Sequence, residues 1–545
     1  MVSQKILTLV YFLTFLLLFP NQSLSSLTLD KRNTGGKERI YNLTITKGPS
    51  SPDGFKRDIY LINGRFPGPL IEADKDDTIV INVKNELCED TTIHSHGIFQ
   101  RGTPWFDGVP GQTQCGIPPN ETFTYKYKVC QSGTYWYHSH SRAQYIEGFV
   151  GPLVIHDPDD PYCKEYDEEI IVLLQDWYHN NSKTLLATFL SPESEGNEPV
   201  PDNGLINGKN CYNCSWAPKD SVCVNEAPLE QFKFVQGKKY RIRIINTSAF
   251  SAFIFSIDEH PLDVIEVEGT ITKRHTVHRL PINIAQRYSV IVTADKPKKK
   301  YFMRSEMEVG CFPTKSDKLN PLVKAVVSYD GCDDKCPSTT AWTDKVDNCV
   351  DLDSNDLKPY KSQHIPDCTK NVTIVAEFHP DDKNVTRGYI NNSTYKIDIK
   401  YPTLNKVFDG ITKFDADQNA FVIEENEDGG EHPFHLHGHV FWVLGSGGKG
   451  TTLDYSKLNT KDPIQRDTVT VPANGWTVLR FVANNPGVWG FHCHIEWHVQ
   501  SGLVAQFVAQ PDKIKKLNPP DEWKAFKYSN AVEIQKHLKV HENFE

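Results

Sequence analysis

Short runs in which apolar and polar residues alternate occur along the whole chain, and runs with helical periodicity are scarce. Alternation puts every second side chain on one face of an extended segment, as in a half-buried strand. Gly, Pro, Asn and Asp separate the runs, which is typical of β-sandwiches and barrels. We therefore predict an all-β protein, with the clearest strands over 78–83, 122–129, 240–245, 288–293 and 476–482.

The chain of 545 residues is too long for a single hydrophobic core. A polar, Gly-containing turn leading into a final strand occurs near 133–155, and a comparable arrangement recurs near 485–507. The segments 157–160 and 332–368 have the composition of linkers, the first acidic with one proline and a second proline directly after it, and the second rich in Cys and Asp. We predict three β domains, over residues 27–157, 158–350 and 369–545.

The N-terminus has the features of a secretory signal. Lys5 precedes an apolar run over 6–19, which is too short to span a bilayer comfortably, and small polar residues follow as far as Ser26. We assign residues 1–26 to a signal peptide rather than to a signal anchor, and expect a secreted, extracellular monomer with no membrane span in the mature chain. A net charge of −10 without a basic stripe argues against a nucleic-acid partner.

Four compact motifs contain ten histidines, two motifs near each end of the chain. A single His-x-His is more often a satisfied polar pair than a pair of metal ligands, but four such motifs together indicate metal chemistry. Zinc fits poorly, because Cys493 between two ligating histidines cannot share one tetrahedral site with both of them. The motifs comprise His94 and His96; His138 and His140; His432, His435 and His437; and His492, His494 and His498, with Cys493 inside the last.

The spacing of these motifs has a geometric meaning. Residues i and i+2 of a strand point to the same face, so each His-x-His offers two imidazoles to one side. Cys493 then points away from His492 and His494, and one strand can serve a multi-metal cluster on one face and a separate metal on the other. A His2Cys ligand set with a weak axial neighbour is typical of a blue copper electron-transfer site. The motif therefore predicts a path of few bonds between two redox centres.

Taken together, the four motifs closely resemble those of the multicopper oxidases, a family that includes laccases, ascorbate oxidases and ferroxidases. The resemblance covers nearly the whole mature chain. It implies three cupredoxin-like Greek-key β-barrel domains, of which the middle one carries no copper ligand. It also implies an enzyme with four copper ions, in which single-electron oxidation of a donor supplies the four electrons that reduce O2 to water.

Carried over position by position, the resemblance assigns a role to each histidine. The type 1 copper would take His432, Cys493 and His498, with Leu503 at the axial position. The type 2 copper would take His94 and His435. The type 3 pair would take His96, His138, His140, His437, His492 and His494. An apolar axial neighbour such as Leu503 cannot donate to copper, which favours Cu(I) and a high reduction potential; ascorbate oxidases, which have Met there, resemble this chain less.

Four carboxylates match acidic positions of the family. The resemblance places Asp107 and Glu496 near the cluster of three coppers, where they would orient ligands or relay protons. It places Asp176 close to His498, where it could accept the proton of a phenol or bind Fe(II), a harder cation that prefers carboxylate oxygens. Asp428, four residues before His432, resembles the second iron-site acid of fungal ferroxidases.

We favour oxidation of phenolic donors, as in laccases, with Fe(II) oxidation as the alternative. Asp428 argues for iron, but it lies in an acidic segment, 424–431, that could be no more than a solvated loop. Asp176 is also shorter than the Glu of ferroxidases, and the membrane anchor that those enzymes often carry is missing. A copper-binding or storage protein without turnover is a third class, and it predicts no O2 consumption with any reductant. A nitrite reductase-like function would leave several of the ten histidines unexplained.

The remaining cysteines and the sequons fit a secreted glycoprotein. Apart from Cys493 there are twelve cysteines, an even number suited to disulfides in an oxidising compartment. For the Cys211-x-x-Cys214 pair we favour a local disulfide over a thioredoxin motif or half a zinc site, because no βαβ pattern surrounds it. Many family members pair a cysteine near Cys115 with one close to the C-terminus, but this chain has none after Cys493. The sequons start at Asn42, Asn120, Asn180, Asn213, Asn246, Asn371, Asn384, Asn391 and Asn392.

Overall fold

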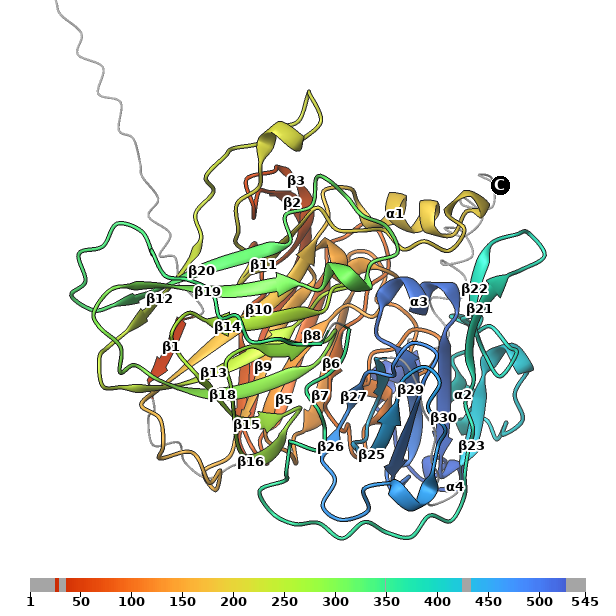
Figure 1. The fold of residues 1–545 in the computed structure, drawn as a ribbon. Coiled ribbons are helices and arrows are strands. Elements are labelled where there is room, and N and C mark those ends of the chain that lie inside the picture. Colours follow the sequence, from red (N-terminus) through yellow and green to blue (C-terminus); the bar gives the residue numbers. More distant parts are fainter. Residues whose placement is uncertain (1–24, 29–35, 348, 424–432, 526–545) are drawn as a thin grey trace, which may run out of the picture.

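The computed structural model describes residues 25–28, 36–347, 349–423 and 433–525 (Figure 1). Strands dominate these residues, which confirms the all-β prediction. Three pairs of sheets follow one another along the chain, and we call them the first, second and third domains. The predicted signal peptide lies outside the described residues except for Ser25 and Ser26, which begin β1. None of the described helices is long and apolar enough to cross a bilayer.

The first domain consists of two four-stranded sheets. One sheet has the order β3-β2-β5-β7 and contains β2 (Glu38–Ser50), β3 (Arg57–Ile62), β5 (Thr78–Asn85) and β7 (Thr122–Lys128). The other has the order β4-β9-β8-β6 and contains β4 (Ile71–Asp74), β6 (His94–His96), β8 (Gly133–His138) and β9 (Val150–His156). In β7 the alternation of the sequence becomes alternation of burial, because Phe123, Tyr125 and Tyr127 face the core.

The second domain has a seven-stranded and a five-stranded sheet. The larger contains β1 (Ser25–Thr28), β10 (Glu168–Trp177), β11 (Asn203–Ile206), β13 (Lys239–Asn246), β15 (Leu262–Val267), β16 (Thr270–Val277) and β18 (Arg287–Thr293). The smaller contains β12 (Glu230–Phe234), β14 (Phe253–Ile257), β17 (Leu280–Ile282), β19 (Lys300–Met307) and β20 (Leu322–Tyr329). Most of the residues of β10, β13 and β18 are buried, as in sheets covered on both faces.

The third domain has a five-stranded and a three-stranded sheet, with a separate hairpin beside them. The five-stranded sheet contains β23 (Ala420–Ile423), β24 (Phe434–Leu436), β27 (Thr468–Val469), β29 (Gly487–Cys493) and β30 (Val504–Ala509). The three-stranded sheet contains β25 (Phe441–Gly447), β26 (Gln465–Arg466) and β28 (Trp476–Phe481), and the hairpin is β21 (Ala376–Pro380) with β22 (Thr386–Ile390). The α-helices are short: α1 (Ser182–Phe189), α2 (Thr403–Phe408), α3 (Glu496–Ser501) and α4 (Pro511–Ile514).

These elements confirm the five strands predicted from alternation. They appear as β5, β7, β13, β18 and β28, each with ends within two residues of the predicted ones. The described residues of the predicted linker 332–368 form neither helix nor strand. Figure 1 shows the strands of the third domain, drawn in blue, beside those of the other two domains. His432 lies outside the described residues, and the other nine histidines of the motifs lie on β6, β8, β24 and β29 or in the segments that follow β8, β24 and β29.

The disulfides differ from the expectation. Cys214 pairs with Cys223, and Cys311 pairs with Cys349, while the other cysteines are unpaired. The even number of twelve therefore does not correspond to six bonds, and the local disulfide at the CxxC pair uses Cys214 without Cys211. A disulfide needs two Cα atoms within ~7 Å, and spacing along the chain does not reveal which cysteines meet in that way. Cys115 is buried and free, and burial raises the pKa of its thiol to about 11.

One sequon is not available to a glycan in the folded protein. Asn246 is fully buried in β13, and its amide donates hydrogen bonds to the carbonyl oxygens of Ser251 and Ile282. A glycan needs a solvent-exposed asparagine, so the Asn246 sequon does not fit a glycosylation site.

Candidate metal centre

Strand pairing brings the histidine motifs together in two halves. β6 pairs with β8, so that His94 lies opposite His138, and β24 pairs with β29, so that His435 lies opposite His492. Only the motif of His94 and His96 lies wholly within a strand. The other three run past a strand end, so the same-face argument from the sequence does not by itself place His140, His437 and His494.

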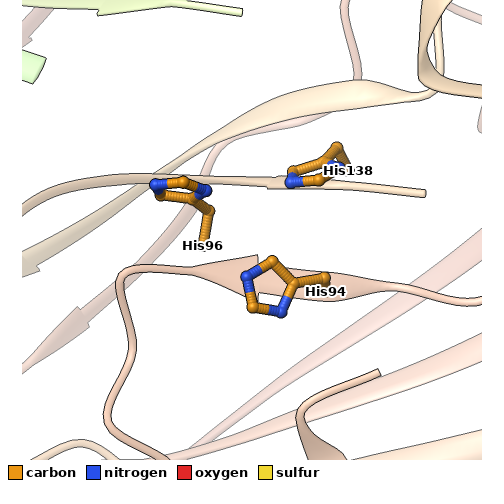
Figure 2. A group of neighbouring side chains, drawn as sticks. All are labelled: His94, His96 and His138. Carbon is orange, nitrogen blue, oxygen red and sulfur yellow. The ribbon is translucent and has the colours of Figure 1, made fainter. Parts of the chain in front are cut away.

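Histidines of the first domain pack against histidines of the third domain. The ring of His94 stacks on that of His437 with centroids 4.2 Å apart, and His96 stacks on His435 at 3.8 Å. The Nε2 atoms of His437 and His492 approach to 2.9 Å. Figure 2 shows the rings of His94, His96 and His138, whose nitrogens lie within 4.8 Å of one another. Two further groups of histidines meet the same limit, His94 with His435 and His437 and His140 with His437 and His492, and so does the group of His96, His435 and Asp467.

The chemistry of this cluster fits a metal. Several buried imidazole nitrogens have no hydrogen-bond partner among the described residues, which would be costly without a ligand; they are Nε2 of His94, His138 and His435 and both nitrogens of His96 and His494. Burial lowers the pKa of seven of these histidines, to about 3 for His140, so these rings are neutral; the other six are His96, His138, His435, His437, His492 and His494. Neutral imidazole is the form that binds a metal, and a set of imidazoles suits copper.

Asp107 lies against two of these histidines, in the place expected for it. Its Oδ2 accepts a hydrogen bond from Nδ1 of His437 at 2.9 Å, and its backbone oxygen accepts one from Nδ1 of His94 at 2.7 Å. Burial opposes ionisation of this carboxyl, but His437 and His94 outweigh it and hold the pKa of Asp107 below its usual range. With each Nδ1–H fixed in this way, the two Nε2 atoms face the cluster as acceptors.

Glu496 begins α3 and is buried. Its carboxyl accepts a hydrogen bond from Gln500 at 2.7 Å, and burial raises its pKa well above the usual range. A cavity of about 570 Å³ reaches His140 and His492 of the cluster, and Gln500 is also part of its lining. The cavity is therefore a route by which a small molecule could approach the histidines.

Cys493 points away from the cluster, as the alternation of the strand requires. It is fully buried in an apolar environment that also contains Leu503, and its Sγ lies 3.3 Å from Nδ1 of His498. Leu503 donates its backbone N–H to the carbonyl oxygen of His498 at 2.9 Å. Of the four residues expected here, His432 lies outside the described residues, as does Asp428.

Sequence reasoning missed the carboxylate that touches His498. Nε2 of His498 donates to Oε1 of Glu198 at 2.8 Å, and Glu198 is partly exposed in the loop before β11. The ring of Phe378, on β21, lies 4.6 Å from the ring of His498. Glu198 and His498 are 300 residues apart, so the only local signal was a glutamate-rich stretch over 193–198.

Asp176 does not have the position expected of a donor-site acid. It is 2 % exposed and accepts backbone N–H groups from Ala249, Phe250 and Ser251 at 2.8–3.0 Å. Burial raises the pKa of Asp176 to about 6, against the effect of these donors. A buried carboxylate whose oxygens are already bonded to the backbone holds a loop, so it cannot also reach a donor molecule.

Comparison with known proteins decides the family. Three family models, each described as multicopper oxidase, match residues 44–160, 168–332 and 378–513. The chain belongs to the multicopper oxidases. It is a copper-dependent oxidoreductase that uses O2, and its three domains have the cupredoxin fold of that family.

Both laccases and iron oxidases are among the relatives of this multicopper oxidase. It is 37% identical over 518 residues to Laccase-1 of Cryptococcus neoformans var. grubii, covering 89% of this chain and 82% of the relative. It is 37% identical over 526 residues to the iron transport multicopper oxidase fetC of Epichloe festucae, covering 90% and 79%. Its fold is similar to the laccase from Botrytis aclada, with TM-score 0.84, 34% identity and coverage of 92% and 93%. For Fet3p, described as a multicopper oxidase that functions in iron import, the TM-score is 0.80, with 29% identity and coverage of 92% and 95%.

Proposed function

We propose that this protein is a secreted oxidase that takes electrons singly from phenolic donors beside His498 and delivers them to O2 at the histidine cluster. The contact of Glu198 with His498 carries this proposal, because it places a hydrogen-bond acceptor at His498, which is 7 % exposed while Cys493 and Leu503 are fully buried. A phenol that binds there can donate its hydroxyl to Glu198 and lie against the ring of Phe378. The proton that leaves with the electron then has an acceptor.

Copper, when bound, supplies the one-electron redox chemistry, with one type 1, one type 2 and two type 3 ions. The residues proposed to hold type 1 copper are His432, Cys493 and His498, with Leu503 as an apolar axial neighbour. Those for type 2 are His94 and His435. The type 3 pair falls to His96, His138, His140, His437, His492 and His494. Two observations support it: His140 groups with His437 and His492, and the ring of His494 lies 5.0 and 5.6 Å from those of His96 and His138.

Residues of the chain connect the Cys493 site to the histidine cluster and provide paths for electrons and protons. Cys493 is bonded through the backbone directly to His492 and His494, which gives electrons a short covalent path. Asp107 fixes the tautomers of His94 and His437. Gln500, which lines the cavity, donates a hydrogen bond to Glu496, and we propose that the carboxyl of Glu496 takes up and releases the protons that pass between the cavity and the cluster.

Oxidation of Fe(II) is the second candidate, and the same contact favours it. A carboxylate oxygen at Glu198 is a ligand that hard cations such as Fe(II) prefer. Asp428 would be the second acid of such a site. The ring of Phe378 beside His498 favours the phenol, because an aromatic donor can pack on it.

The test compares O2 consumption by copper-loaded protein with a methoxyphenol, Fe(II) and ascorbate. The phenol should support the highest kcat/KM. Fe(II) turnover that far exceeds phenol turnover and is lost in Glu198→Ala and Asp428→Ala would overturn the laccase proposal in favour of iron. No O2 consumption with any donor would instead indicate a copper-storage protein.

A further inference from the structure

The second domain carries none of the ten histidines, yet two of its charged side chains are buried against the histidine cluster. Arg287, at the start of β18, is 0 % exposed, and Glu268, in the turn between β15 and β16, is 1 % exposed. Both contact residues 466–468 of the third domain. Burying a charge costs desolvation free energy, so the partners of these two side chains must compensate for it.

Arg287 touches all three domains. Its Nη1 and Nη2 each donate to one carboxylate oxygen of Asp467 at 2.6 Å, in the third domain. Its Nε donates to the carbonyl oxygen of Thr134 at 3.0 Å, on β8 of the first domain. The planar guanidinium makes a bidentate pair with the carboxylate, which fixes the orientation of the Asp467 side chain as well as its distance.

Asp467 in turn contacts two histidines of the cluster. Its backbone oxygen accepts a hydrogen bond from Nδ1 of His435 at 2.9 Å. Its Oδ1 lies 3.5 Å from the same nitrogen and 3.6 Å from Nε2 of His96. Both carboxylate oxygens are bonded to Arg287, and Thr468 also donates to Oδ1. Asp467 is therefore placed to orient histidines rather than to bind a metal itself.

Glu268 holds the backbone of the same segment. Its Oε2 accepts the N–H groups of Asp467 and Thr468, both at 2.9 Å. Its Oε1 accepts a hydrogen bond from Nη2 of Arg466 at 2.6 Å. The second domain thus fixes the segment through the side chain of Asp467 and, independently, through the backbone on both sides of it.

We infer that Arg287 is a positioning residue for the copper held by His94 and His435, so that the domain without ligands controls whether this copper is retained. The inference rests on the proposed copper assignment. Arg287 fixes Asp467, and Asp467 fixes the ring of His435 so that its unpaired Nε2 faces the cluster. Loss of such an outer partner typically weakens metal affinity by about 10- to 100-fold.

The experiment replaces Arg287 by Lys, which keeps the positive charge but cannot make the bidentate hydrogen bond to Asp467. Arg304→Lys is the matched control, because Arg304 makes a similar buried pair with Asp258, at 2.8 and 2.9 Å, in the same domain. Copper-loaded proteins are dialysed against graded chelator concentrations. Copper per chain and the type 2 electron paramagnetic resonance signal are then measured, with the type 1 absorption from Cys493 as internal reference.

Arg287→Lys should release its type 2 copper at about 10- to 100-fold lower chelator concentration than the wild type, with the type 1 absorption retained and Arg304→Lys unchanged. Equal retention in Arg287→Lys and wild type, or equal loss in both variants, would overturn the inference. If Arg287→Lys does not fold by circular dichroism, Glu268→Gln tests the same segment: selective type 2 loss supports the inference, and wild-type retention refutes it. A wild type that binds no type 2 copper would refute the proposed function instead.

Discussion

Replacing Glu198 by Gln removes the charge beside His498 while keeping the shape of the side chain. In the structure the two side chains meet at 2.8 Å and are 17 % and 9 % exposed, so solvent screens the contact only in part. A hydrogen bond to a charged acceptor contributes about 1.5–3 kcal/mol, against about 0.5–1.5 kcal/mol for a neutral one. The expected loss is therefore about 1–2 kcal/mol, or roughly 5- to 30-fold in rate, for a phenol that uses this acceptor.

The assay is anaerobic reduction of the type 1 absorption by a methoxyphenol in a stopped-flow instrument, which isolates the step at His498. Reoxidation by O2 is measured separately and should not change, because the cluster lies on the other face of β29. Glu193→Gln is the control, since Glu193 is an exposed glutamate of the same loop. The reasoning is refuted if Glu198→Gln accepts electrons from the phenol at the wild-type rate, or if Glu193→Gln slows this step equally.

Three further predictions concern stability and the metal sites. A Cβ on Gly388 would lie 2.7 Å from Cβ and 2.9 Å from N of Leu503, so Gly388→Ala should cost about 1–3 kcal/mol and shift the type 1 absorption; an unchanged melting temperature and spectrum would contradict this. Burial raises the pKa of Asp176 from its ordinary value near 3.8 to about 6. Between these values the folded state binds more protons than the unfolded state, so stability contributed by this group is present below pH ~4 and lost as the pH rises through ~6. The difference in melting temperature between the wild type and Asp176→Asn should therefore shift against the wild type as the pH rises from ~4 to ~6. A difference that does not change with pH would contradict the prediction. Chelation of copper should lower the melting temperature reversibly, because the imidazole nitrogens of His96 and His494 then have no hydrogen-bond partner. For copper at a thousand times its Kd, the free energy of unfolding should fall by roughly 4 kcal/mol.

Much of the fold could be predicted, because alternation reports burial directly wherever a strand is long enough. β7 (Thr122–Lys128) and β28 (Trp476–Phe481) are examples. The strands that carry histidines were harder, since β6 and β24 are only three residues long. Their extended conformation comes from pairing with β8 and β29 rather than from a local pattern.

The acids show where sequence reasoning failed. Asp107 lies beside the cluster, where the resemblance to the multicopper oxidases placed it. Asp176 was expected beside His498, but its carboxylate accepts hydrogen bonds from a neighbouring loop at residues 249–251. A carboxylate in a sequence does not reveal whether backbone N–H groups or solvent will surround it.

The sequence by itself determined the metal chemistry of this protein. The proposed ligands lie in motifs of a few residues, and covalent spacing within a strand separates Cys493 from its neighbouring histidines whatever the rest of the chain does. Only the tertiary structure decided which charges surround those ligands. Glu198 meets His498 across 300 residues, and Arg287 meets Asp467 across 180. Such contacts depend on how separate domains pack against one another, and no local pattern in the chain encodes the partner of a charged side chain.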